Sequence, residues 1–93
     1  MDKFAAIFQP GSIGSLKLEN RLIMNAMGTV LTDGQSNPTQ RTYDYYAARA
    51  RGGAGLITTQ CMAVSRDAAT PWELAIYDDS FIPGLKNIAE TIH

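Results

Sequence analysis

Two apolar runs of strand length, separated by one helical pattern, constrain the fold of this chain most strongly. The runs cover residues 22–27 and 55–60, and their first residues lie 33 positions apart. Between them, residues 40–51 place Tyr43, Tyr46, Ala47 and Ala50 on one helical stripe. Two parallel strands joined by a crossover helix make a βαβ unit of about 30 residues. The pattern therefore predicts an α/β fold.

The boundaries of these elements carry their own signals. The run at residues 22–27 is continuously apolar and does not alternate, which favours a parallel strand buried on both faces. Thr39 is the expected N-cap of the helix, because its hydroxyl can accept from the free N–H groups of the first turn. Gly52-Gly53 offers a left-handed stop after the last turn. Residues 28–38 and most of residues 61–79 are expected to be loop.

The two ends of the chain predict a hairpin and a second helix. Within the opening segment, residues 1–15, apolar residues stand at helical spacing before Pro10-Gly11 breaks any helix. Gly14-Ser15 then separates two short runs with high β-propensity, which is the pattern of a two-residue hairpin. Near the other end, Ser80 is the expected cap of a helix. Its apolar stripe consists of Ile82, Leu85, Ile88, Ala89 and Ile92.

The length of the chain limits how much of an α/β fold it can form. An eight-stranded barrel needs about 250 residues, or about 31 for each strand and helix. With 93 residues, the chain matches the N-terminal quarter of a TIM (β/α)8 barrel, with a hairpin at its bottom, and is incomplete on its own. We therefore interpret residues 1–93 as one N-terminal segment: hairpin, strand, helix, strand and the start of a second helix. The helical pattern still runs at His93, which favours a truncation.

Composition excludes several functional classes. Eight basic and nine acidic residues leave a net charge of -1, so no basic stripe is available for nucleic acid. No apolar run approaches the roughly 20 residues of a membrane span, and the N-terminus lacks the apolar core of a signal peptide. A single cysteine, Cys61, excludes an internal disulfide and a cysteine-rich zinc site. The expected protein is soluble, globular and cytoplasmic, with no metal site in this chain.

The ends of the two predicted strands are the candidate functional positions. Active sites of α/β barrels lie on the loops that follow the strands. A flat aromatic cofactor across a barrel mouth needs close approach of the backbone, which small residues allow. Small residues also occur at strand ends for packing alone, so this signal leaves both readings open. The segments concerned are Ala26-Met27-Gly28-Thr29 and Gln60-Cys61-Met62-Ala63.

Several ordered motifs resemble the N-terminal portion of the old yellow enzyme family, the NADH:flavin oxidoreductases that include 2,4-dienoyl-CoA reductases and enoate reductases. No single motif is specific, but together they follow the family's order over nearly all 93 residues. The matching segments are Phe8-Gln9-Pro10, Ile13-Gly14, Asn20-Arg21 with the apolar strand to Met27, residues 45–57, residues 76–79, and Ile82-Pro83-Gly84-Leu85.

The resemblance implies a TIM barrel that holds FMN without a covalent bond at the carboxyl ends of its strands. Ala26, Met27 and Gly28 would line the flavin with their backbone, and Cys61 would touch it after the second strand. Members often carry Thr or Cys at the position of Gly28, where the side chain tunes the flavin, so that tuning is absent here or falls to Thr29. Val30 lies near a position where some members have a substrate-contacting Tyr, and a valine cannot donate a hydrogen bond.

The function implied is that of an FMN-dependent oxidoreductase in which NADH or NADPH reduces the flavin, and the flavin reduces an activated alkene of the enoate or dienoyl-CoA type. The family's catalytic residues and any iron–sulfur cluster would lie beyond His93, so the catalytic residues are unknown here and this chain alone is expected to be inactive. The partner is a small-molecule substrate, and an oligomer is left open. Two alternatives are a non-catalytic remnant or half barrel that needs a partner chain, and a different TIM-barrel enzyme.

Overall fold

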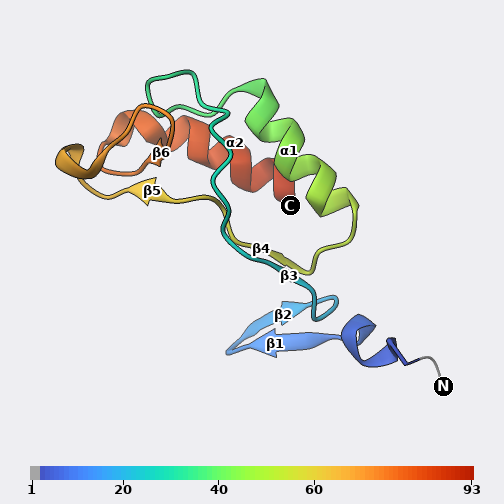
Figure 1. The fold of residues 1–93 in the computed structure, drawn as a ribbon. Coiled ribbons are helices and arrows are strands. Elements are labelled where there is room, and N and C mark those ends of the chain that lie inside the picture. Colours follow the sequence, from blue (N-terminus) through green and yellow to red (C-terminus); the bar gives the residue numbers. More distant parts are fainter. Residues whose placement is uncertain (1–2) are drawn as a thin grey trace.

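The computed structural model describes residues 3–93, so the first two residues of the predicted opening segment lie outside it. Helices α1 (Gln40–Arg51) and α2 (Ile82–Ile92) pack side by side over short strands, and the N-terminal hairpin lies at the far end from them (Figure 1). The molecule is elongated, with extents of 51 × 27 × 20 Å. Its α/β class agrees with the prediction.

The central unit is the predicted strand, helix and strand. Strand β3 (Ile23–Met24) pairs in parallel with β4 (Leu56–Ile57), and α1 connects them. Both strands are shorter than the runs 22–27 and 55–60, although the Thr58 N–H still donates to the Met24 carbonyl at 3.0 Å. Within residues 3–93, β3 and β4 pair only with each other. An isolated pair of strands is marginally stable, so only a short hydrogen-bonded ladder forms.

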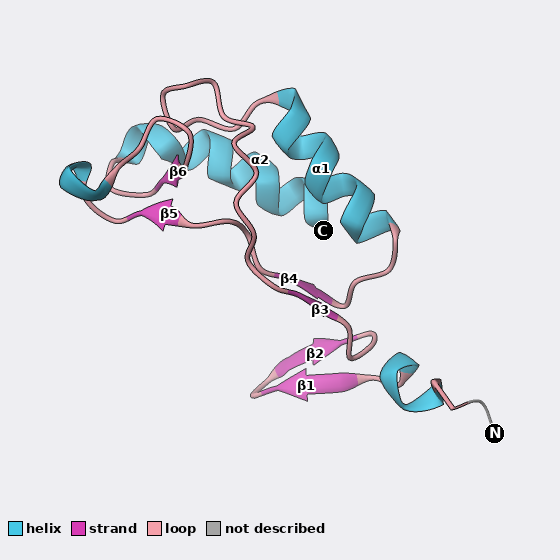
Figure 2. Ribbon diagram, viewed as in Figure 1, coloured by secondary structure: helices cyan, strands magenta, loops and turns pink. Residues whose placement is uncertain are grey.

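The prediction that the first run is buried on both faces is wrong for this chain. Ile23 is 49% exposed and Met27 is 64% exposed. A parallel strand is buried when helices cover both faces of its sheet, whereas here α1 and α2 lie on one side only (Figure 2). An apolar groove of about 600 Å³ also stays open between β2, β4 and α2. The described residues therefore leave apolar strand surface uncovered, as expected for part of a barrel.

The N-terminal hairpin is confirmed. Strands β1 (Gly11–Ile13) and β2 (Leu16–Leu18) pair antiparallel, with Ile13 opposite Leu16 across a two-residue turn. Gly14 has φ +58, a conformation that glycine adopts without a steric penalty. Before the hairpin, the apolar residues at helical spacing form one 3-10 turn, η1 (Ala5–Phe8).

The boundaries of α1 are also confirmed, and Thr39 and Thr42 form a capping box at its start. Thr39 is the N-cap, and its backbone N–H donates to the Thr42 hydroxyl at 3.0 Å. The Thr39 hydroxyl donates to the Leu31 carbonyl at 2.6 Å. After the helix, Gly53 has φ +104 and ends it in the left-handed region. The bond from Thr39 to Leu31 attaches the start of α1 to the loop that follows β3.

Residues 61–79 contain more regular structure than the predicted loop. Strand β5 (Met62–Ala63) pairs in parallel with β6 (Leu74–Ala75), and the 3-10 turn η2 (Arg66–Ala68) lies between them. Ala63 and Ala75 are buried against Phe81. Strands of two residues show no periodicity, so the sequence offered no signal for them. Their pairing depends on burial that only the folded chain provides.

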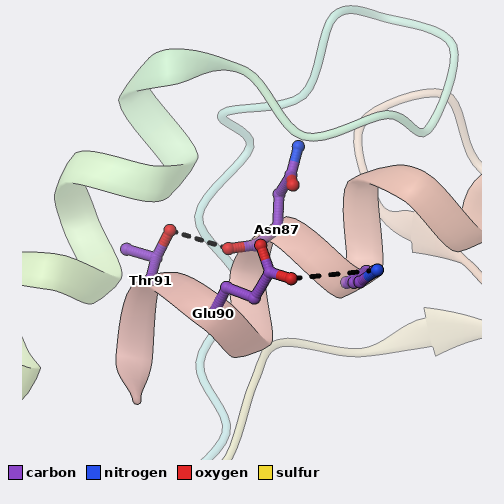
Figure 3. Close-up of polar contacts among 4 residues, drawn as sticks. Asn87, Glu90 and Thr91 are labelled. Carbon is purple, nitrogen blue, oxygen red and sulfur yellow. Dashed lines mark hydrogen bonds and ion pairs between the residues drawn. The ribbon is translucent and has the colours of Figure 1, made fainter.

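The core lies between the helices and the strands. Tyr46, Leu74 and Ile88 are buried together, and Met24, Ile57 and Leu85 pack around them. The predicted stripe of α2 is therefore partly correct, because Ile88 faces this core whereas Ile82 is 55% exposed. Along α2, the Thr91 hydroxyl donates to the Asn87 carbonyl at 2.7 Å, and the Lys86 Nζ atom lies 3.9 Å from the Glu90 Oε1 atom (Figure 3).

Ser80 does not cap the final helix, contrary to the prediction. It lies inside a 3-10 turn, η3 (Asp79–Phe81), that precedes α2. The cap of that turn is Asp78, whose carboxylate accepts from the Ser80 N–H at 2.9 Å. A charged carboxylate is a stronger acceptor than a hydroxyl and favours the positive end of a helix.

We expect Asp78→Ala to destabilise the start of α2, and the loss to depend on pH. The hydrogen bond from Ser80 holds the pKa of the Asp78 carboxyl below its ordinary value of 3.8. A depressed native pKa means that the stabilisation is present above the unfolded pKa and disappears as the pH falls through the native pKa. Urea unfolding of both proteins should show a difference at pH 7 that shrinks below pH of about 4. A difference that stayed constant down to pH 2 would contradict this role.

Candidate functional site

The candidate site lies at the carboxyl ends of β3 and β4. Because the strands are parallel, both ends are at the same edge of the pair. The chain leaves this edge as residues 25–29 on one side and residues 58–61 on the other, and the two segments run together before they diverge (Figure 2). In the complete barrels of this architecture, this edge carries the active site.

The four predicted cofactor-facing residues lie on the two segments that leave this edge, Ala26, Met27 and Gly28 shortly after β3 and Cys61 four residues after β4. Ala26, Met27, Gly28 and Cys61 are exposed. A Cβ atom placed on Gly28 would meet nothing within 4 Å. Among residues 3–93, the backbone groups of Ala26, Met27 and Gly28 make no hydrogen bond. This stretch therefore presents free donors and acceptors on an open surface, and its role toward a cofactor stays a prediction.

Gln60 joins the two segments, and the sequence, which places it in a candidate segment, does not predict this linking role. Its side chain is almost fully buried, with 3% of the residue exposed. The Gln60 Oε1 atom accepts from the Thr29 hydroxyl at 2.5 Å, and the Gln60 N–H donates to the Tyr46 hydroxyl at 2.9 Å. A buried amide needs such partners, because an unpaired polar group loses its hydration without compensation. The only signal in the sequence is a polar amide at the end of an apolar run.

Helix α1 supports the site through two adjacent tyrosines. Tyr46 is fully buried, and burial raises the pKa of its hydroxyl above the ordinary value of 10. Its ring packs edge-on against Tyr45, with 5.2 Å between centroids. The Tyr45 hydroxyl lies 4.0 Å from the Met27 sulfur, and the Arg49 guanidinium lies 3.9 Å from the Tyr45 ring centroid. One helix therefore contacts both segments of the site.

We expect Tyr46→Phe to lower the free energy of unfolding by about 1–3 kcal/mol, the usual cost of leaving a buried donor unpaired. The ring and its packing are retained, so the loss isolates the hydrogen bond from the Gln60 N–H. Urea unfolding and hydrogen exchange of the Gln60 amide measure it. Tyr43→Phe on the same helix is the control, since no hydrogen bond joins the Tyr43 hydroxyl to residues 3–93. Equal losses in both variants would contradict the assignment.

The turn after Gly28 is held in an unusual conformation. Val30 has φ +50 and is 71% exposed. The left-handed region is unfavourable for a β-branched residue, so neighbouring contacts must hold it there. The Leu31 N–H donates to the Thr29 hydroxyl at 3.4 Å. The Leu31 carbonyl accepts from the Thr39 and Thr42 hydroxyls at 2.6 and 3.0 Å.

The remainder of this loop is attached to the segment before β6. The Thr32 hydroxyl donates to the Pro71 carbonyl at 2.7 Å, and the Ser36 N–H donates to the same carbonyl at 3.0 Å. A Cβ atom placed on Gly34 would lie 3.6 Å from the Trp72 ring, which is an ordinary contact distance. The loop after β3 is thus ordered by side-chain hydroxyls rather than by regular structure.

The fold and the edge define the class of protein. The described residues form the N-terminal portion of an α/β barrel: a hairpin, a parallel strand pair with its crossover helix, and a second helix, with an open edge at the strand carboxyl ends. Within residues 3–93, no helix is long and apolar enough to cross a membrane.

The sequence profile of the NADH:flavin oxidoreductase / NADH oxidase family matches residues 6–93, and the chain belongs to this family. It is 37% identical over 95 residues to an NADH oxidase of Thermoanaerobacter brockii, which covers all of this chain and 15% of that protein. Flavin and NADH or NADPH are the redox partners that the family implies.

Solved structures agree with this assignment. Morphinone reductase superimposes with a TM-score of 0.84 at 32% identity, over 95% of this chain and 23% of that one. The old yellow enzyme of Trypanosoma cruzi superimposes with a TM-score of 0.86 at 27% identity, over 97% of this chain and 24% of that one. The resemblance to old yellow enzymes is confirmed, and so is the fold, a part of a TIM barrel. The chain spans about a quarter or less of the length of these relatives.

Proposed function

We propose that residues 1–93 are the N-terminal segment of an FMN-dependent oxidoreductase that uses NADH or NADPH to reduce an activated alkene of the enoate or dienoyl-CoA type. The observation that carries the proposal is the exposed stretch Ala26, Met27 and Gly28 that follows β3 at the carboxyl edge of the β3–β4 pair, with Cys61 exposed on the segment that follows β4. This segment alone is inactive in our proposal, because the catalytic residues of this family would come from later strands of the barrel.

The residues at this edge fit a flavin. The polar edge of an isoalloxazine ring carries N–H and C=O groups, and the backbone of Ala26, Met27 and Gly28 has unbonded groups of both kinds. Gly28 leaves open space where a side chain would stand. The exposed Cys61 adds a small side chain from the second segment. Bound FMN supplies the two-electron chemistry that links a nicotinamide to an alkene.

This chain's own residues bind and orient in the proposed function. Ala26, Met27 and Gly28 line the cofactor with their backbone, and Cys61 contacts it from the adjacent strand end. The buried Gln60 joins these two segments by accepting from the Thr29 hydroxyl, and its N–H fixes it to Tyr46 of α1. Residues outside this chain hold the FMN phosphate and the substrate, and determine whether NADH or NADPH is used. A cytoplasmic location suits a protein that draws on either nicotinamide.

The names of the relatives support a reductase. One of the matched proteins is an NADH oxidase and another is morphinone reductase. The name of this relative does not determine which acceptor the present protein reduces, because the chain covers 23% of the morphinone reductase chain. An activated alkene is our proposal for its chemical class.

The test begins with the protein purified from its source. We expect an intact mass several-fold above 10.1 kDa, together with the yellow absorbance of oxidised flavin. NADH or NADPH should bleach that absorbance anaerobically, and an α,β-unsaturated acid, ester or CoA thioester should restore it. A colourless protein of 10.1 kDa would favour a non-catalytic remnant. A full barrel that left the absorbance of added FMN unchanged would favour a different barrel enzyme.

A further inference from the structure

We propose that Thr29 is a positioning residue, which sets the distance between the two flavin-facing segments and does not itself tune the flavin. The inference rests on the proposed function, because it assumes a flavin at this edge. Its physical basis is one hydroxyl that joins Gln60 on the second segment to Leu31 in the turn of the first.

The hydrogen of the Thr29 hydroxyl is already engaged. It donates to Gln60 Oε1 at 2.5 Å, and the oxygen accepts the Leu31 N–H at 3.4 Å. A hydroxyl has one hydrogen to donate. Thr29 therefore has no donor left for a flavin while the bond to Gln60 exists. The alternative raised by the sequence, that Thr29 takes over the tuning role missing at Gly28, does not agree with this geometry.

Both partners of Thr29 are themselves fixed by α1. The Gln60 N–H donates to the Tyr46 hydroxyl, and the Leu31 carbonyl accepts from the Thr39 and Thr42 hydroxyls. Thr29 thus bonds to two residues, Gln60 and Leu31, that are each held in place by helix α1. Its bond to Leu31 spans Val30, whose φ of +50 requires such support.

The hydrogen bonds of Thr29 lie next to the proposed flavin site in the sequence. Thr29 directly follows Gly28, and Gln60 directly precedes Cys61. The hydrogen bond between Thr29 and Gln60 therefore joins the two segments right beside Gly28 and Cys61, the residues that would face the flavin. If that bond is lost, the segments can separate while the core around Tyr46 stays packed.

The experiment compares Thr29→Val with Thr29→Ser in the full-length gene product. Valine keeps the shape and removes the hydroxyl, whereas serine keeps the hydroxyl. We expect Thr29→Val to bind FMN about tenfold more weakly and to change the visible circular dichroism of the bound flavin, with Thr29→Ser within about twofold of wild type. In the flavin-free protein, the Leu31 amide should exchange faster in Thr29→Val only.

A second variant covers the case in which Thr29→Val folds poorly. In Thr29→Val with Val30→Gly, glycine adopts the positive φ without support, so the turn forms while the bond to Gln60 stays absent. We expect this double variant to fold and still bind FMN about tenfold more weakly. Wild-type affinity and dichroism in Thr29→Val or in the double variant would overturn the positioning role alone. A wild-type protein that bound no FMN would overturn the proposed function and this inference with it.

Discussion

Gly28→Leu is expected to weaken FMN binding by about 100-fold, which corresponds to about 2.7 kcal/mol. In the chain itself the new side chain starts in open space, since a Cβ on Gly28 has no atom within 4 Å. A flavin on the backbone of Ala26, Met27 and Gly28 would occupy that open space and collide with the leucine. The quenching of FMN fluorescence on binding measures the affinity in the full-length protein.

Two controls isolate the steric effect. Gly28→Ala adds one methyl group and should lose much less affinity than Gly28→Leu. Ala48→Leu places the same leucine side chain on the exposed surface of α1 and should bind FMN as the wild type does. Thermal melts should show all three variants folded. Unchanged affinity in Gly28→Leu would remove Gly28 from the cofactor site.

Gly55→Ala is expected to destabilise the fold by about 1–3 kcal/mol, the usual cost of overpacking. A Cβ on Gly55 would lie 2.6 Å from both the carbonyl oxygen and the side-chain oxygen of Asn20. The Asn20 side chain cannot move away freely, because it donates to the Gly53 carbonyl at 2.6 Å and accepts from the Leu22 N–H at 2.9 Å. Urea unfolding measures the loss in free energy.

Gly28→Ala is the matched control for this substitution as well. It makes the same chemical change at a position where the new methyl group meets open space. The two glycines therefore separate steric conflict from the general effect of replacing glycine on the unfolded chain. Equal stability of the two variants would contradict the close approach of Asn20 to Gly55. A loss confined to Gly55→Ala would support the attachment of residue 20 to the start of β4.

Much of the fold could be predicted from the sequence, because its signals are local. Helical spacing in residues 40–51, a glycine after the last turn and a Gly-Ser turn each depend on residues close in the chain. The structure accordingly has α1 and the β1–β2 hairpin within the predicted segments. The parallel pairing of β3 with β4 followed from the crossover helix between them. Local periodicity and chain connectivity were sufficient for these elements.

The incorrect predictions concern burial and competing partners. Ile23 belongs to a run that predicts burial on both faces, but burial requires neighbours that the described residues do not supply. The pairing of β5 with β6 joins residues 12 apart through two residues each, too few for a pattern. Asp78 rather than Ser80 caps the turn before α2, because that turn already begins at Asp79 and leaves Ser80 inside it, where its N–H donates to the Asp78 carboxylate.

For the candidate site, the sequence alone determined at which edge of the strand pair it lies, because two parallel strands end on the same side. The sequence also determined the small residues that follow the strands, Ala26, Gly28 and Cys61. Only the tertiary structure decided how that edge is held. The bonds of Gln60 reach Thr29 and Tyr46, which are 31 and 14 positions away. No local pattern encodes such pairs, since a buried amide takes whichever partner the packed chain brings within hydrogen-bonding distance.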